Sequence, residues 1–195
     1  MALYGAMYPV IATATYTPAQ GSTAASIAYS AAKVLTQLAR CDVTENYVNG
    51  KYDADDRRVI YKQKYIDTDI SLEVQNLALE DFKQLYGHTI TTQTNISELK
   101  KSGSDIIPNI AYGFIHVEAL EDGSEKWVAH FFPWSQATPA ALNYATQSSD
   151  AINLAGHGLT MKAYDDPVDL IHECVEEFTT EAAAKAYLNS KVNLS

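Results

Sequence analysis

Charged residues are missing from the start of the chain: the first 32 residues contain no Asp, Glu, Lys or Arg. A signal peptide begins with a cationic segment, and Tyr4, Gly5 and Pro9 interrupt the apolar residues here, so export is not expected. A segment without charge can be covered by a neighbouring chain without burying unpaired ions. Residues 1–30 are therefore either an N-terminal arm or an ordinary strand that follows a mobile terminus.

Cysteines and long apolar segments are also scarce in this chain of 195 residues. The two cysteines, Cys41 and Cys174, are too few and too far apart for a zinc knuckle or a disulfide scaffold, so we interpret them as reduced thiols. No stretch approaches the roughly 20 apolar residues that a membrane span requires, so no membrane contact is expected. The length and the hydrophobic content of 47% fit one domain over residues 1–195.

Basic residues are outnumbered, because 24 acidic residues against 14 basic ones give a formal net charge of −10. The acids cluster at residues 42–83 and at residues 165–181, where seven carboxylates occur without Lys or Arg. Proteins that grip DNA or RNA present a basic surface, so this composition argues against direct nucleic-acid binding. It is compatible with a wall that DNA passes without binding, since carboxylates repel phosphates within a Debye length of about 8 Å.

A polar, turn-rich segment at residues 47–58 lies between two stretches with the alternating apolar residues of strands. Asn49-Gly50 is a strong turn signal, because Gly tolerates positive φ and Asn visits the left-handed region more readily than most residues. We therefore expect a long hairpin whose acidic loop, residues 47–58, projects as an arm. The candidate contacts with a neighbouring subunit are Asn49, Tyr52, Asp53, Asp55, Asp56, Arg57 and Arg58.

Strand patterns also dominate the second half of the chain, which predicts a mainly β (α+β) fold. Residues 110–119 and 126–132 alternate around a turn at 121–124 and form a predicted hairpin, with Pro133 ending its second strand. Residues 149–164 are expected to form a further strand, interrupted by Gly156-His157-Gly158.

Two segments have the pattern of short helices. The Leu and Phe spacing at residues 77–86 predicts an amphipathic helix that ends at Gly87. A second helix is predicted near the end of the chain, with Thr179 or Thr180 as the N-cap and Glu181 in the first turn.

Several short motifs follow one another over almost the whole chain. They are Tyr-Pro-Val-Ile-Ala (8–12), Val-Thr-Glu-Asn-Tyr (43–47), Tyr-Asp-Ala-Asp-Asp (52–56), Ile-Ser-Leu-Glu-Val (70–74), Leu-Tyr-Gly-His-Thr (85–89), Ala-Tyr-Gly-Phe-Ile (111–115), the aromatic strand 127–134 and Glu-Phe-Thr-Thr-Glu-Ala (177–182). In this order they resemble the major tail proteins of long, non-contractile tailed phages of Gram-positive bacteria. The family's acidic turn usually continues into small and acidic residues, whereas Arg57-Arg58 follow here, which leaves the partner of the loop open.

The resemblance implies a tail tube fold: two packed antiparallel sheets that form a sandwich or barrel with one or two flanking helices. It implies a structural virion protein without catalytic activity, cofactor or metal, which assembles as stacked hexameric rings into the hollow conduit for phage DNA delivery. The implied partners are further copies of the chain, a tape-measure protein and a tail terminator, while genomic DNA passes through the lumen without specific binding. The subunit would fold in the host cytoplasm and end in the phage tail.

Two places in the sequence contain groups of possible metal ligands. Asp53, Asp55 and Asp56 resemble the start of a calcium loop, but the positions that require an oxygen ligand, Gly and Glu hold Arg57, Arg58 and Lys64. His172-Glu173-Cys174 contains three possible ligands, yet adjacent side chains point in different directions and no second cluster completes a site. Neither place is predicted to hold a metal.

Two other functional classes stay open alongside the tube subunit. Trp127, Trp134 and 13 tyrosines could form the platform of a β-sandwich module that binds a carbohydrate or a receptor. Asp67 and Asp69 lie on one face of a predicted strand and are either a carboxylate pair of a glycoside hydrolase or a solvated strand face. The other histidines, His88, His116, His130 and His157, are interpreted as isolated.

Overall fold

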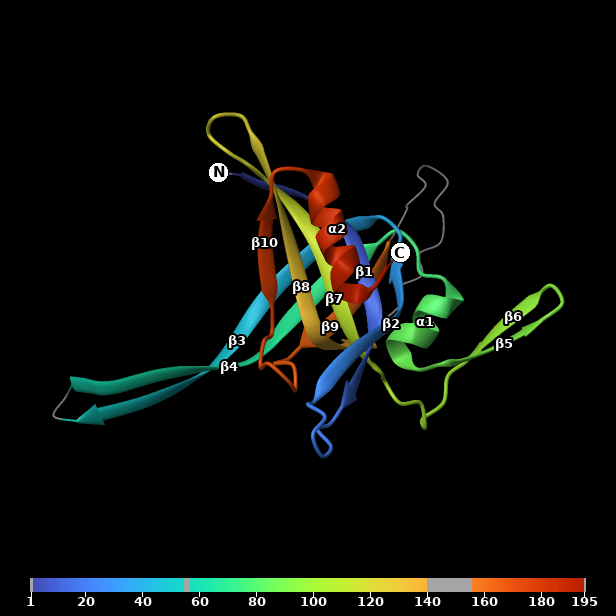
Figure 1. The fold of residues 1–195 in the computed structure, drawn as a ribbon, viewed down its shortest axis with the longest axis horizontal. Coiled ribbons are helices and arrows are strands. Elements are labelled where there is room, and N and C mark those ends of the chain that lie inside the picture. The colour runs from blue at the N-terminus through green and yellow to red at the C-terminus, as the bar shows by residue number, and fades with distance from the viewer. Residues whose placement is uncertain (1, 55–56, 140–155, 195) are drawn as a thin grey trace, which may run out of the picture.

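The computed structural model describes residues 2–54, 57–139 and 156–194. The fold is mainly β with two short helices, which confirms the predicted fold class (Figure 1). In chain order the elements are β1 (Ala2–Thr17), β2 (Ser26–Val34), β3 (Leu38–Ala54), β4 (Arg57–Val74), α1 (Leu79–Tyr86), β5 (Thr89–Gln93), β6 (Ile96–Lys100), β7 (Asn109–Ala119), β8 (Glu125–Thr138), β9 (His157–Ala163), β10 (Cys174–Phe178) and α2 (Glu181–Val192).

Eight strands form one antiparallel sheet in the order β2-β1-β7-β8-β9-β4-β3, with β10 added to the free part of β8. The sheet bends over, so that core residues from its two halves meet in one cluster. Ile11 and Tyr112 enter this cluster from β1 and β7, and Leu72 enters it from β4. The result is a sandwich-like body whose interior is filled by apolar side chains.

The two faces of β7 serve two different cores. Tyr112 and Phe114 point into the sandwich, whereas Ala111 and Ile115 belong to a second cluster beneath α2. Successive side chains of a strand point to opposite faces, which explains the alternation. A Cβ at Gly113 would lie 2.9 Å from Leu188 Cδ2, so this glycine permits the close approach of α2 to the sheet.

The start of the chain is part of the body. β1 pairs with both β2 and β7, and Val10, Ile11 and Ala12 are almost fully buried. An uncharged segment can be buried within its own subunit as readily as under a neighbour. The N-terminal arm proposed for residues 1–30 is therefore wrong for residues 2–17, which form an ordinary strand.

Both predicted helices are present; α1 ends where predicted but begins at Leu79, two residues later than predicted, and α2 has the predicted N-cap. α1 ends at Gly87, which has a φ of 73°, and an added Cβ there would collide with the carbonyl oxygen of Ile106. In α2 the Thr180 side chain accepts a hydrogen bond from the backbone N–H of Ala183, so Thr180 is the N-cap.

The strands predicted at residues 110–119, 126–132 and 149–164 are present as β7, β8 and β9, and two of their ends differ from the prediction. β8 runs through Pro133 to Thr138, because the pairing with β7 shifts between Ile110 and Tyr112 and leaves Pro133 in an irregular part of the ladder. A proline is tolerated at such a bulge, where its missing N–H breaks no ladder bond. β9 begins at His157, and residues 149–155 lie outside the described residues.

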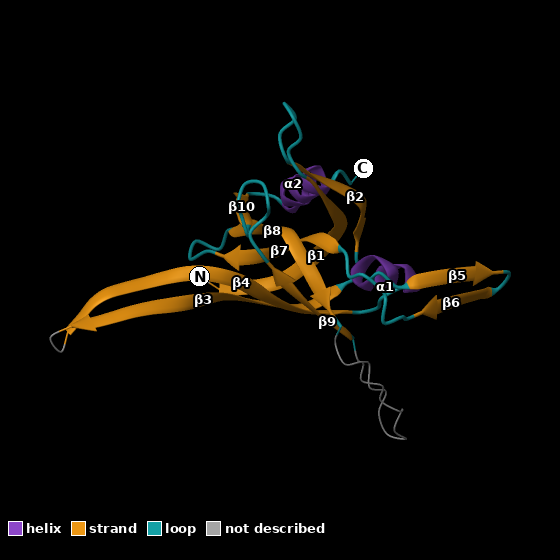
Figure 2. Cartoon of the chain, turned by 90° about the horizontal axis from the view of Figure 1, so that it is seen from below, coloured by secondary structure: helices purple, strands orange, loops and turns teal. Residues whose placement is uncertain are grey.

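Two hairpins extend from opposite sides of the body (Figures 1 and 2). The longer one consists of the distal parts of β3 and β4, and the shorter one is the separate two-stranded sheet β5-β6. α2 covers one outer face of the sheet, as Figure 2 shows. The body thus leaves two ribbons outside its cores.

Candidate assembly surfaces

The longer hairpin is a continuous ribbon of paired backbone. Asn49 pairs with Gln63 and Gly50 with Lys62, and the pairing continues to Ala54 opposite Arg57. The turn predicted at Asn49-Gly50 and the loop predicted at residues 47–58 are therefore wrong over residues 47–54 and 57–58. A turn signal is local, and here the long cross-strand ladder overrides it. We call residues 47–65 the arm.

Five of the seven predicted contact residues, Asn49, Tyr52, Asp53, Arg57 and Arg58, belong to the strands of this arm. Asn49 is exposed, and its Oδ1 accepts a hydrogen bond from the Tyr61 hydroxyl at 2.9 Å. The backbone of Tyr52 and Asp53 belongs to β3, and that of Arg57 and Arg58 belongs to β4. Asp55 and Asp56 lie outside the described residues. The register therefore places the two sides of the predicted segment on neighbouring strands, with Asp53 opposite Arg58.

Apolar and aromatic side chains of the arm are exposed to solvent. Val48 is 53% exposed, and Tyr47 and Tyr61 are also among the exposed large hydrophobic residues. Tyr47 packs edge-on against Tyr65 with ring centroids 6.0 Å apart. A cluster of exposed apolar groups on a projecting ribbon is typical of an interaction surface.

Polar contacts fix the arm where it leaves the body. The Asn46 side-chain amide donates to Asp67 Oδ1 and to Asp69 Oδ2, each at 2.7 Å. Lys162 Nζ lies 3.0 Å from Asp67 Oδ2 and 2.8 Å from Asp69 Oδ1. These bonds from Lys162 and Asn46 hold the pKa of the Asp69 carboxyl below its usual value. Asp67 and Asp69 therefore act as a structural brace, ion-paired by Lys162.

The pairing at this root is irregular, which changes the direction of the ribbon. Asn46 pairs with Asp67 and Tyr47 with Tyr65, so Ile66 is an extra residue opposite this step. A β-bulge of this kind bends a strand. Figure 1 shows the ribbon turning as it leaves the body. The Tyr65 hydroxyl also donates to the carbonyl oxygen of Ala163 at 3.0 Å, which ties the arm to β9.

Open strand edges provide further surface for contacts between subunits. β2 and β3 end the strand order of the large sheet, and in the described part of the chain β10 pairs with β8 alone. Unpaired N–H and C=O groups at such edges can pair with a neighbouring chain. On the shorter hairpin and the loop after it, Ile96 and Ile106 are 63% and 85% exposed.

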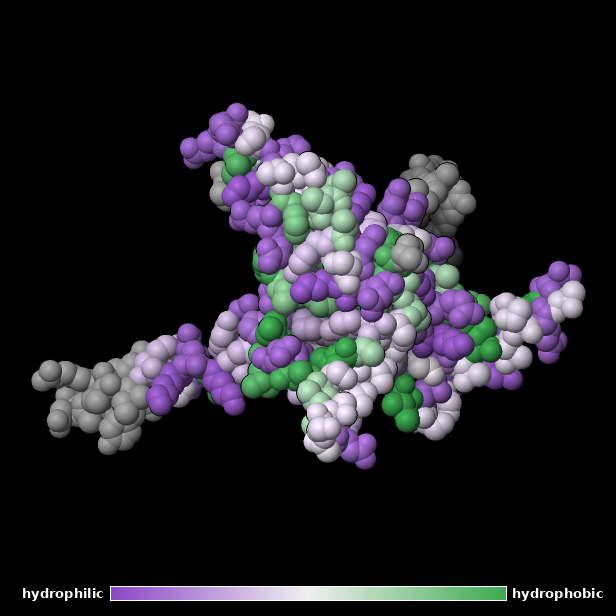
Figure 3. All heavy atoms as spheres, in the orientation of Figure 1, coloured by the Kyte–Doolittle hydropathy of each residue, from purple (hydrophilic) through white to green (hydrophobic). Residues whose placement is uncertain are grey.

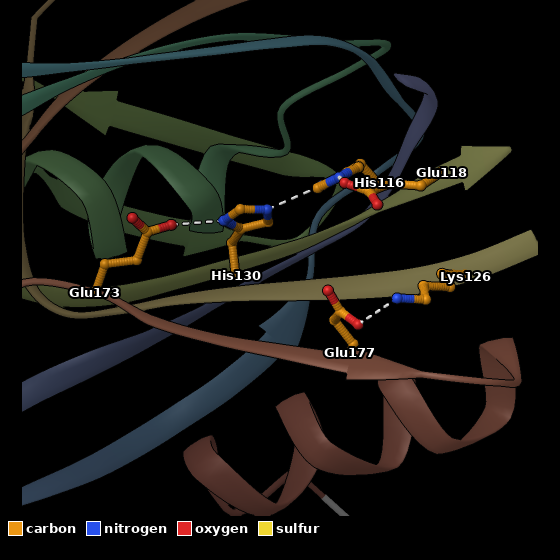
Figure 4. A network of polar contacts seen from close by, with 6 residues as sticks. All are labelled: His116, Glu118, Lys126, His130, Glu173 and Glu177. Carbon is orange, nitrogen blue, oxygen red and sulfur yellow. Dashed lines mark hydrogen bonds and ion pairs between the residues drawn. The ribbon is translucent and has the colours of Figure 1, made fainter. Parts of the chain in front are cut away.

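Two histidines interpreted as isolated are joined in the structure. His130 Nε2 lies 2.9 Å from His116 Nδ1, and His130 Nδ1 lies 2.5 Å from Glu173 Oε1 (Figure 4). His116 Nε2 is 3.4 Å from Glu118 Oε1, which completes a chain of four side chains. The hairpin register is the signal that could have revealed the pair, because Phe114 opposite His130 places His116 diagonally across from it.

Each of the two rings contacts one carboxylate and the other ring. Burial lowers the pKa of His116, an effect that its bond to Glu118 opposes. The Glu173 of the tripeptide His172-Glu173-Cys174 thus binds His130, while His172 stacks on Tyr65 with ring centroids 4.0 Å apart.

A cavity of about 560 Å³ opens beside the two histidines. It lies between β3 and the inner face of β7 and β8, and its polar lining includes Arg40, Cys41, Glu45, His116, His130 and Glu173. Burial raises the pKa of the Cys41 thiol to about 11, so this thiol stays protonated at neutral pH. The cavity has the volume of a small-molecule site, although it is open to solvent on one side.

The described residues contain neither a cluster of metal ligands nor a membrane-spanning helix. Within them, no group of three or more His, Cys, Asp or Glu side chains is arranged to hold a metal ion. No helix among them is both long and apolar enough to span a bilayer.

Comparison with known proteins adds no family to this picture. No model of a known protein family matches the chain, and no curated protein matches it.

Proposed function

We propose that the protein is a structural virion protein, the major subunit of a phage tail tube, which assembles as hexameric rings stacked into a hollow conduit for DNA. The motif order described above suggests this function. The observation that carries it in the structure is the arm: a long, braced ribbon with exposed apolar side chains and, among its described side chains, no fully buried one. The exposed apolar side chains of such a ribbon are removed from water when a neighbouring copy covers it.

The open edges of β2, β3 and β10 support the same proposal. In a subunit that stays alone, unpaired edges are a liability, because they promote uncontrolled pairing. In a ring, neighbouring copies cover the edges, and contacts between different surfaces of identical subunits produce rings or filaments. The tape-measure protein and the tail terminator are further proposed partners.

The charge of the chain is also compatible with a conduit for DNA. At a formal net charge of −10, the subunit offers few basic groups that would release counterions and retain the phosphate backbone. DNA would therefore pass the wall without specific binding. The carboxylates of Asp67 and Asp69, which an enzyme would need for acid and base catalysis, are instead bound to Lys162 and Asn46.

A second candidate is a β-sandwich module that binds a carbohydrate or a receptor. The cavity beside His116 and His130 favours it, because its volume of about 560 Å³ and its mixed polar and aromatic lining suit a small ligand. A glycan array and a titration of His116 signals by nuclear magnetic resonance would detect such binding. A specific ligand together with a purely monomeric state would favour this candidate over the tube.

Light scattering on the purified chain tests the leading proposal. With rising concentration, we expect the mass to change from one 21.4-kDa chain to six chains and to multiples of six. A mass of one chain at every concentration and at low and physiological salt would contradict the proposal. The matched control is a chain with the same body and a shortened arm, which should remain a single subunit.

A further inference from the structure

Large apolar side chains are exposed on the segment that leads into β10. Leu170 is 72% exposed, and Ile171 and Val175 are exposed as well. Figure 3 shows hydrophobic surface at the lower end of β10, where this segment lies in Figure 1. We call Asp169, Leu170, Ile171 and Glu176 the β10 surface, whereas Val175 lies on the opposite face of β10 from Glu176 because strand side chains alternate. Exposed apolar groups that lie close together mark sites of contact.

The loop that presents Leu170 is built by an almost fully buried carboxylate. Asp166 Oδ1 accepts hydrogen bonds from the N–H groups of Val168 at 2.8 Å and Asp169 at 2.7 Å, and its Oδ2 accepts one from Ile171 at 3.1 Å. Leu170 is held at a φ of 57°, a left-handed conformation that residues with a Cβ rarely adopt. The fold thus keeps a large apolar side chain in solvent at a conformational cost, which indicates a contact function.

Charge distinguishes this region from the arm. Residues 165–181 contain seven carboxylates and no Lys or Arg, and Asp169 and Glu176 form no ion pair with any described residue. Residues 47–66 instead hold five of the 14 basic residues of the chain against three acids. The arm is therefore the most basic part of an acidic protein, and it is complementary to the β10 surface.

Two lysines of the arm, Lys62 and Lys64, lie on one face of the ribbon. Lys64 pairs with Val48 and Lys62 with Gly50, so Val48, Lys62 and Lys64 share a face, and all three are exposed. The neighbouring residue Tyr65 lies on the other face and stacks on His172 of its own subunit. Because strand side chains alternate, the lysine face points away from that subunit's β10 segment.

We propose that the face formed by Val48, Lys62 and Lys64 docks on the β10 surface of a second copy of the chain. Val48 would pack against Leu170 and Ile171, and the lysines would approach Asp169 and Glu176. The contact joins two different surfaces, so it propagates into rings or filaments instead of closing a dimer. The inference rests on the proposed self-assembly and specifies which surfaces meet.

Charge reversal tests the docking. The arm variant Lys62→Glu/Lys64→Glu and the surface variant Asp169→Lys/Glu176→Lys should each require a roughly tenfold or higher protein concentration to assemble. The quadruple variant, which carries both reversals, should recover assembly because opposite charges meet again. The matched control is Lys83→Glu/Lys185→Glu, the same charge change on the helices α1 and α2, and it should assemble like the wild type.

The possible outcomes separate the docking from the proposed function. Normal assembly of either double variant, or a folded quadruple variant as impaired as the doubles, overturns the docking while tubes of the wild type still support the function. If the wild type does not assemble, the proposed function fails. Zero-length carboxyl-to-amine cross-linking of mixed ¹⁴N and ¹⁵N chains then decides the docking alone. Cross-links from Lys62 or Lys64 to Asp169 or Glu176 between differently labelled chains support it, and their absence overturns it.

Discussion

β4 passes through two regions that use the same strand in different ways. In the body, Ile70, Leu72 and Val74 of β4 are buried in the core of the sandwich. In the arm, Lys62 and Lys64 of the same strand are exposed. The body half buries apolar area and therefore stabilises the fold, whereas the arm half exposes its described lysines Lys62 and Lys64 and is attached to the body at its root through Tyr65. The difference indicates that the arm is kept for contacts outside the subunit.

The largest expected effect is on assembly and comes from shortening the arm. Replacing residues 48–64 by Asn-Gly, which connects Tyr47 to its cross-strand partner Tyr65 and removes the proposed docking face, should leave a folded chain that no longer assembles. The free energy of unfolding should change by about 0.5 kcal/mol or less, because a two-stranded ribbon outside the core contributes little. Urea unfolding and light scattering measure the two properties. Assembly at normal yield would show that the arm is not an assembly surface.

The opposite result is expected for a core residue of the body. Leu188 of α2 is fully buried against the sheet, and Leu188→Ala should lower the free energy of unfolding by about 3 kcal/mol. The matched control is Leu170→Ala, which removes the same atoms from an exposed side chain and should change the stability by about 0.5 kcal/mol or less. Equal losses in the two variants would remove the distinction between core and contact surface.

The root of the arm should show an intermediate effect. Lys162→Met removes the cation between Asp67 and Asp69, so two carboxylates lose their ion pair and the arm loses part of its brace. Because these groups are partly exposed, we expect a loss of stability below about 1 kcal/mol together with weaker assembly. Lys162→Arg, which keeps the charge, is the control. A loss of assembly as large as that caused by shortening the arm would indicate a direct contact of Lys162.

The smallest effect concerns the pH dependence of the body. Burial lowers the pKa of His116 in the folded state, so the unfolded chain binds this proton first as the pH falls. The stabilising contribution of neutral His116 is complete above the unfolded pKa of about 6.5 and is lost as the pH falls toward the folded pKa. The loss should be about 1 kcal/mol or less. A titration of His116 by nuclear magnetic resonance should give a midpoint below about 6.5, and a higher midpoint would contradict this account.

Local signals in the sequence predicted much of the fold. The alternation at residues 110–119, the stop at Gly87 and the Thr180 cap depend on neighbouring residues, and the structure confirms each of them. Asn49-Gly50 misled because turn chemistry permits a reversal there without requiring one, and a long ladder of paired residues determined its position. Pro133 misled because it lies in a bulge of β8, and a bulge is a property of the pair of strands.

The surfaces and the histidine pair were harder to predict, because they depend on contacts between distant segments. Glu173, which directly precedes β10, contacts His130 from 43 positions further along the sequence, and no local pattern relates the two. Lys162 lies beside Asp67 because β9 pairs with β4, a pairing between strands far apart in the chain. The uncharged first residues were compatible with burial inside one subunit or between subunits. The pairing of β1 with β7 shows that the backbone of residues 2–17 belongs to the body of its own subunit.

Electron micrographs of the concentrated, negatively stained wild-type chain test the central claim most directly. We predict hollow tubes or six-membered rings, and isolated subunits when residues 48–64 are replaced by Asn-Gly. Single subunits of the wild type at every concentration, or tubes that form equally well without the arm, would contradict the account.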